Sequence, residues 1–129
     1  MARLAVALVA CALAFPVAAA APAVIEPKAL GERIAWADQS LIVLDVRTPE
    51  EYAAGHLPGA VNIPHSELAG RIAELSGARD RDIVVYCRTG ARTGQALEVL
   101  KKAGFERLFH LKGDYTRWSE EKRPVIAAQ

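Results

Sequence analysis

The organisation of this chain is clearest in residues 83–92, which read Ile-Val-Val-Tyr-Cys-Arg-Thr-Gly-Ala-Arg. The first four residues form a continuous apolar run, which is typical of a strand buried on both faces. Glycine and polar residues follow Cys87, and a helical pattern then continues to about Ala103. The sequence therefore predicts a strand, a tight loop and a helix, with Cys87 at the point where the strand ends.

A loop of this kind directs backbone N–H groups and the positive end of the following helix at whatever lies in its concavity. A sulfur atom placed there is pushed toward the thiolate, which is the nucleophilic form of cysteine. Cys87 is therefore our candidate nucleophile. The alternative interpretation is a buried and inert structural thiol.

The N-terminal residues are expected to be a signal peptide rather than part of the fold. Arg3 precedes an apolar stretch over residues 4–15, and small residues surround Ala20. This stretch falls short of the ~20 residues that a membrane-spanning helix needs. We predict cleavage after Ala20 and a periplasmic or secreted protein. The alternative is a lipid anchor on Cys11, because residues 8–11 resemble a lipoprotein signal.

The remaining residues, 21–129, are enough for a single domain. The full chain has 16 basic and 15 acidic residues, and loss of Arg3 would balance them. A balanced charge gives no field that would recruit nucleic acid or an anionic membrane. The histidines His56, His65 and His110 do not show the spacing of metal ligands, so no metal site is predicted.

Strand-like and helix-like segments alternate along the chain, which predicts an α/β fold with a parallel sheet and helices on its faces. Thr48 begins a capping signal for a short helix. Trp36 and Trp118 are expected in the core. Strands are expected over residues 41–45, 60–63, 83–86 and 107–110, longer helices over residues 28–37, 67–76, 91–103 and 115–121, and a linker over residues 21–27.

The carboxyl ends of parallel strands share one edge of the sheet, where α/β proteins bind ligands. Asp45 and Cys87 both fall at this edge. We expect Asp45 and Arg47 to tie loops together by hydrogen bonds. Arg92 opposes the dipole of its own helix, so it needs an anion or a carboxylate such as Asp45 or Glu51 beside it. Arg88 is the better candidate for contacting an anionic substrate.

Four segments together resemble a rhodanese domain, and the resemblance runs from about Val24 to Val125. With an export signal and a single domain, the chain is similar to the periplasmic sulfurtransferases of the phage shock protein E type. The segments are Leu44-Asp45-Val46-Arg47, Glu51-Tyr52, Gly55-His56-Leu57-Pro58-Gly59-Ala60-Val61-Asn62-Ile63-Pro64 and Val85-Tyr86-Cys87-Arg88-Thr89-Gly90-Ala91-Arg92-Thr93.

The resemblance implies a rhodanese-like α/β fold, with a five-stranded parallel sheet and helices on both faces. It also implies transfer of sulfane sulfur from thiosulfate, through a persulfide on Cys87, to cyanide, a small thiol or a protein thiol. No metal or organic cofactor is implied. The amide cradle that binds the substrate maps onto Arg88, Thr89, Gly90, Ala91, Arg92 and Thr93.

Two other functions stay open at this point. Related cysteine loops of phosphatases and arsenate reductases resemble Cys-x5-Arg, whereas only four residues separate Cys87 from Arg92. A non-catalytic binding module is the other alternative, although many such modules lack the cysteine. The chain also departs from the family at Gly113-Asp114, where two glycines are usual. Asp114 is expected either to cap the last helix or to place a carboxylate near the active-site edge, where it would weaken anion binding.

Overall fold

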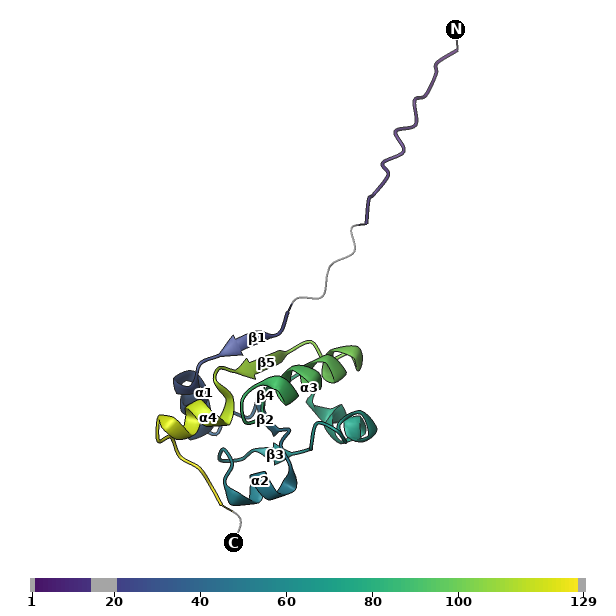
Figure 1. The fold of residues 1–129 in the computed structure, drawn as a ribbon. Helices are drawn as coiled ribbons and strands as arrows, with labels where there is room; N and C mark the ends of the chain where they lie inside the picture. Colours follow the sequence, from purple (N-terminus) through teal and green to yellow (C-terminus); the bar gives the residue numbers. More distant parts are fainter. Residues whose placement is uncertain (1, 15–20, 128–129) are drawn as a thin grey trace.

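The structure is a computed structural model, and it describes residues 2–14 and 21–127 (Figure 1). Residues 2–14 are exposed and form no helix or strand. The predicted cleavage point after Ala20 lies outside the described residues. Within the described ranges, no helix combines the length and the apolar character needed to cross a membrane.

Five parallel strands form one sheet in the order β1-β5-β4-β2-β3, as the sequence predicted for the fold class. β4 lies at its centre, and Asp45 of β2 stands in register with Tyr86 of β4. This pairing brings the carboxyl ends of the two central strands together. The strands are β1 (Ala23–Ile25), β2 (Leu41–Asp45), β3 (Val61–Asn62), β4 (Asp82–Tyr86) and β5 (Leu108–Leu111).

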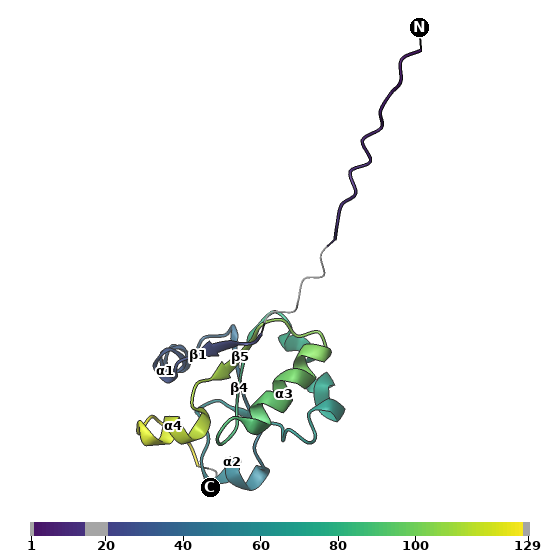
Figure 2. The same cartoon turned by 45° about the horizontal axis from the view of Figure 1, so that its top comes forward.

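Helices cover both faces of the sheet, and Figure 2 shows α3 on one side with α1 and α4 on the other. The predicted capping box is present: Thr48 accepts from the Glu51 N–H, and the Glu51 carboxylate accepts from the Thr48 N–H. The helices are α1 (Pro27–Ala35), α2 (Pro49–Ala54), the 3-10 helix η1 (Ala69–Ala78), α3 (Ala91–Lys102) and α4 (Asp114–Glu120).

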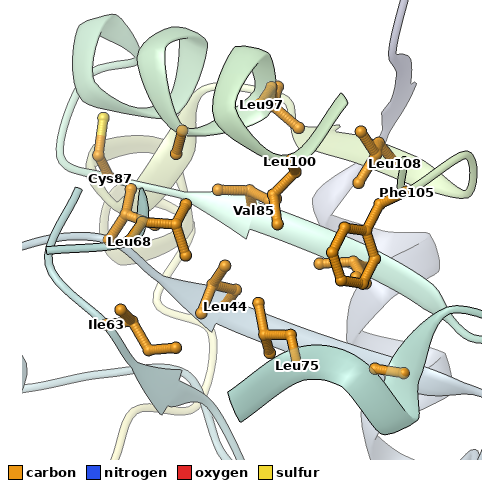
Figure 3. Packing of buried hydrophobic residues seen from close by; sticks show 14 residues of the cluster. Leu44, Ile63, Leu68, Leu75, Val85, Cys87, Leu97, Leu100, Phe105 and Leu108 are labelled. Atoms are coloured by element: carbon orange, nitrogen blue, oxygen red, sulfur yellow. The ribbon is translucent and has the colours of Figure 1, made fainter. Parts of the chain in front are cut away.

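Successive side chains of β4 point to opposite faces of the sheet, and the core accordingly has two layers. Val85 and Cys87 face the layer under α3 and η1, where Leu97 also packs (Figure 3). Val84 faces the opposite layer, where it lies with the side chain of Trp118 from α4. Because both faces of the strand are covered, its sequence reads as a continuous apolar run. The same alternation turns the Cys87 side chain toward the start of α3.

Two predictions about elements and one about a core residue were wrong. Residues 23–25 are the edge strand β1 and not a linker, since a three-residue strand with two exposed side chains carries little pattern. Residues 69–78 form a 3-10 helix, shifted from the expected α-helix over 67–76. Trp36 is 76% exposed, because α1 ends at Ala35 and Ala37 turns the chain away with a φ of 52°. Trp118 is buried as predicted.

Candidate active site

Cys87 follows the last residue of β4, and its side chain is only 1% exposed. The backbone N–H of Gly90 donates a hydrogen bond to its Sγ over 3.0 Å. Gly90 has a φ of 124°, which strongly favours glycine. A Cβ at that position would also lie 3.2 Å from Oδ2 of Asp114. The glycine therefore lets the loop bring an N–H to the sulfur.

The start of α4 holds the peptide groups next to the nucleophile. The Cys87 carbonyl accepts a hydrogen bond from the N–H of Tyr115 over 3.0 Å. The Arg88 carbonyl accepts from both the N–H and the hydroxyl of Thr116, at 3.1 and 2.9 Å. These bonds fix the backbone of the loop directly after the end of β4.

Asp114 lies behind the loop and is 2% exposed. Its Oδ1 accepts from the N–H of Cys87 at 3.0 Å and from the hydroxyl of Thr93 at 2.8 Å, and its Oδ2 lies 2.8 Å from Nε2 of His110. Burial acts to raise the pKa of Asp114, but hydrogen bonds from His110, Cys87 and Thr93 outweigh it and hold the pKa below its ordinary value.

Of the two roles expected for Asp114, the carboxylate at the active-site edge is the one observed. Its side chain does not cap α4, whose cap position is Gly113. Sequence reasoning missed His110 as its partner. The available signal was the four-residue spacing of His110 and Asp114 across the turn from β5 to α4.

Arg92 pairs with Glu51, one of its two expected carboxylate partners. The two guanidinium nitrogens lie 2.6 and 3.1 Å from the carboxylate oxygens, which joins α3 to α2. The hydrogen bond from Arg92 lowers the pKa of Glu51 to about 2, against the opposing effect of partial burial. The charge of Arg92 is thus compensated within the protein.

Asp45 and Arg47 form a buried ion pair with a nitrogen–oxygen distance of 2.6 Å. The Tyr86 hydroxyl donates to Asp45 over 2.7 Å, and Arg47 donates to the Gly55 carbonyl over 2.6 Å. Burial, followed by the charge of Asp45, raises the pKa of Tyr86. Through these contacts Asp45 and Arg47 link the end of β2 to Tyr86 of β4 and to the backbone at Gly55.

A cavity of about 260 Å³ opens beside the loop at this same edge. Arg88 lines this cavity. Arg88, Thr89 and Ala91, the first residue of α3, are all exposed. Of the predicted cradle, Gly90 contacts the sulfur while the side chains of Thr93 and Arg92 turn to carboxylates. The cavity is lined by Arg47, Glu51, Ala54, Gly55, Arg88 and Tyr115.

Two further features of the structure bear on where the site lies. A larger hollow of about 650 Å³ lies at the amino ends of the strands, where Asp82 and Leu108 line it, away from Cys87. Among the residues that the structure describes, no three histidine, cysteine or acidic side chains gather as metal ligands. Cys87, the exposed Arg88 and the cavity of about 260 Å³ beside the loop therefore form one candidate site.

A family model described as the rhodanese-like domain matches residues 26–121, which is most of the chain. The chain belongs to the rhodanese-like domain family. It is 36% identical over 105 residues to a sulfurtransferase of Allochromatium vinosum, covering 81% of this chain and 95% of that protein. It is also 42% identical over 62 residues to the thiosulfate sulfurtransferase PspE of Escherichia coli, covering 48% of this chain and 60% of that protein.

Solved structures agree with the rhodanese-like fold. The crystal structure of the Alr3790 protein from Anabaena superposes with a TM-score of 0.73 at 34% sequence identity. The superposition covers 80% of this chain and 82% of that one. The relatives of this chain thus include proteins named as sulfurtransferases.

Proposed function

We propose that the protein is a sulfurtransferase that carries sulfane sulfur as a persulfide on Cys87, with thiosulfate as the donor. The observation that carries this proposal is the 3.0 Å hydrogen bond from the Gly90 N–H to Sγ of Cys87, at the start of α3. An N–H donor and a helix N-terminus both favour negative charge on the sulfur. The named sulfurtransferases among its relatives support the same class of reaction.

The proposed reaction has two displacement steps. The Cys87 thiolate attacks the outer sulfur of thiosulfate, the sulfur–sulfur bond of the donor breaks, and sulfite leaves with the electron pair. A nucleophilic acceptor then attacks the outer sulfur of the persulfide, and Cys87 leaves as a thiolate. The Gly90 N–H stabilises this leaving thiolate. Cyanide would become thiocyanate, and a small or protein thiol would become a persulfide.

Arg88 is the proposed contact for the anionic donor. Its side chain is exposed at the cavity beside Cys87, whereas Arg92 is engaged with Glu51. A guanidinium offers paired N–H donors that match the oxygens of thiosulfate. In this proposal the loop from Arg88 to Thr93 surrounds the transferred sulfur through its backbone.

The test of this function is thiosulfate-dependent formation of thiocyanate from cyanide. We expect native protein to turn over and the Cys87→Ser variant to lose activity by a factor of at least about 10³, because a serine hydroxyl is a poor nucleophile without a base. The circular dichroism spectrum and melting temperature of the variant should match the native protein. A folded native protein without turnover would favour a non-catalytic module.

We also propose that the protein is exported to the periplasm or secreted, and that the exported form begins at Ala21. The apolar stretch and small residues of the N-terminal segment support this. N-terminal sequencing of the exported protein should find Ala21 or a close neighbour and no lipid. An acylated Cys11 at the N-terminus would show a lipid-anchored protein instead.

A further inference from the structure

A buried carboxylate lies directly behind the nucleophile, and the proposed displacement steps do not use it. Asp114 Oδ1 is 3.0 Å from the backbone nitrogen of Cys87, so its charge lies close to the place where the thiolate forms. Its Oδ2 would be 3.2 Å from a Cβ on Gly90, whose N–H contacts the sulfur. The carboxylate thus accepts a hydrogen bond from Cys87 and lies next to Gly90, the residue whose N–H contacts the sulfur.

His110 is the titratable partner of this carboxylate. Its Nε2 lies 2.8 Å from Oδ2 of Asp114, and its side chain is 29% exposed, so solvent protons reach it. The other donors to Asp114 are the Cys87 N–H and the Thr93 hydroxyl, which keep their protons in the range where histidine titrates. Apart from the Cys87 thiol itself, His110 is therefore the one group of this cluster whose charge can change near neutral pH.

The charged groups of the site other than Asp114 and His110 lie in ion pairs or on the exposed loop. In the sheet, His110 lies in register with Val85 of β4 and Val24 of β1, which are apolar. On the other side of the loop, Arg92 is paired with Glu51. Asp45 is paired with Arg47, and Arg88 lies exposed on the loop itself.

We propose that Asp114 is a positioning residue for the sulfur-carrying loop and that His110 controls how strongly its charge opposes the Cys87 thiolate. When His110 is protonated, the pair is neutral and the thiolate meets little repulsion. When His110 loses its proton, the carboxylate is uncompensated and disfavours a second negative charge nearby. The inference rests on the proposed function, since the thiolate is the group that accepts sulfur.

The test is the rate at which iodoacetamide alkylates Cys87 in the full-length protein, followed from about pH 5 to pH 9 by mass spectrometry of the Cys87 peptide. Asp114→Asn keeps an oxygen that accepts the bonds from Cys87 and Thr93 but removes the charge. We expect alkylation at about pH 7.5 to become roughly three- to tenfold faster than in the native protein. Asp114→Gly, which suits the φ of 52° at this position, should accelerate alkylation in the same direction.

His110→Gln leaves the Asp114 charge without a counter-ion at every pH. Alkylation at about pH 6 should then become roughly three- to tenfold slower than in the native protein. In the Asp114→Asn background the same change should alter the rate by less than about twofold, because no carboxylate remains to couple with residue 110. His65→Gln is the matched control, and it should leave the profile unchanged.

An unchanged alkylation profile in Asp114→Asn would overturn the inference, as would an equal effect of His110→Gln in both backgrounds. Slower alkylation at every pH in both Asp114 variants would overturn it as well, because it would show that Asp114 only holds the loop. Alkylation requires no sulfur donor. A shifted profile without sulfur uptake would therefore contradict the proposed function while supporting the coupling, and normal uptake with an unchanged profile would do the reverse.

Discussion

A substitution at Arg88 should distinguish binding of the sulfur donor from the chemical step. It is exposed at the cavity next to Cys87 and takes no part in the ion pair of Arg92 and Glu51. We predict that Arg88→Ala raises the KM for thiosulfate about tenfold, because a hydrogen bond to a charged group contributes about 1.5–3 kcal/mol. The rate at saturating donor should change little.

Arg81→Ala provides the matched control for this measurement. Arg81 is an exposed arginine immediately before β4, at the opposite end of the strand from Arg88. Its replacement should leave the KM for thiosulfate unchanged. A native KM in the Arg88 variant would remove Arg88 from donor binding.

The positions of single residues were predictable only where one strand or one helix end determines them. Cys87 and Asp45 lie at the same edge because β2 ends at Asp45 and β4 ends just before Cys87, and both strands were visible as apolar runs. The charge of Arg92 near a helix start indicated a carboxylate partner, but the choice of Glu51 depends on the packing of α2 against α3. The contact of Asp114 with Cys87 joins residues 27 positions apart, so no local pattern reports it.

At the scale of elements, the turn into α4 determines how the loop is held. Gly113 has a φ of 78°, and a Cβ there would overlap the Cβ of Arg117. We predict that Gly113→Ala lowers the free energy of unfolding by about 1–2 kcal/mol or more. Sulfur transfer should fall as well, because Tyr115 and Thr116 hold the loop carbonyls.

Gly94→Ala is the contrasting glycine change. Gly94 lies inside α3, and a Cβ there would meet no atom within 4 Å. Urea unfolding should show a gain of about 0.5–1 kcal/mol for this variant, because alanine favours a helix more than glycine does. Equal stabilities of the two alanine variants would contradict the role assigned to the turn before α4.

The ion pair of Glu51 and Arg92 joins α2 to α3 across the site and gives a pH-dependent contribution to stability. The folded protein holds the pKa of Glu51 at about 2, below an ordinary 4.5. A lowered carboxylate pKa stabilises the fold above the ordinary value, and this stabilisation is lost as pH falls from about 4.5 to about 2. We predict that Glu51→Gln costs about 1 kcal/mol at neutral pH, since the pair is partly exposed.

Glutamine can retain the capping box with Thr48, so this variant tests the ion pair alone. The difference from the native protein should shrink as the pH is lowered through this window in chemical unfolding experiments. Glu50→Gln, in the same turn of α2, should show no such convergence. A difference in stability that stays constant with pH would contradict the assignment.

Elements were predictable in proportion to their length and burial. β4 and α3 are long, apolar on the buried side and bounded by clear signals, and both appear where the sequence places them. β1 has three residues and gains its strand character by pairing with β5, which a linear sequence does not show. η1 buries Leu75 and Ala78 but winds more tightly than the expected α-helix.

For the molecule as a whole, the length of the cysteine loop is expected to select the substrate. Four residues lie between Cys87 and Arg92, and Arg92 is already paired with Glu51. A phosphoryl group requires converging donors for three oxygens. We predict negligible hydrolysis of aryl phosphates by the native protein. Insertion of one residue between Ala91 and Arg92 should increase it and reduce sulfur transfer, and efficient hydrolysis by the native chain would contradict this selection.

The most direct test of the sulfur-carrier role is the mass of the intact protein after incubation with thiosulfate. The native protein should gain the mass of one sulfur atom at Cys87, and cyanide should remove that mass with formation of thiocyanate. The Cys87→Ser variant should gain nothing under the same conditions. A folded native protein that never acquires the sulfur, or one that acquires it equally in the serine variant, would contradict the proposal that Cys87 carries sulfur.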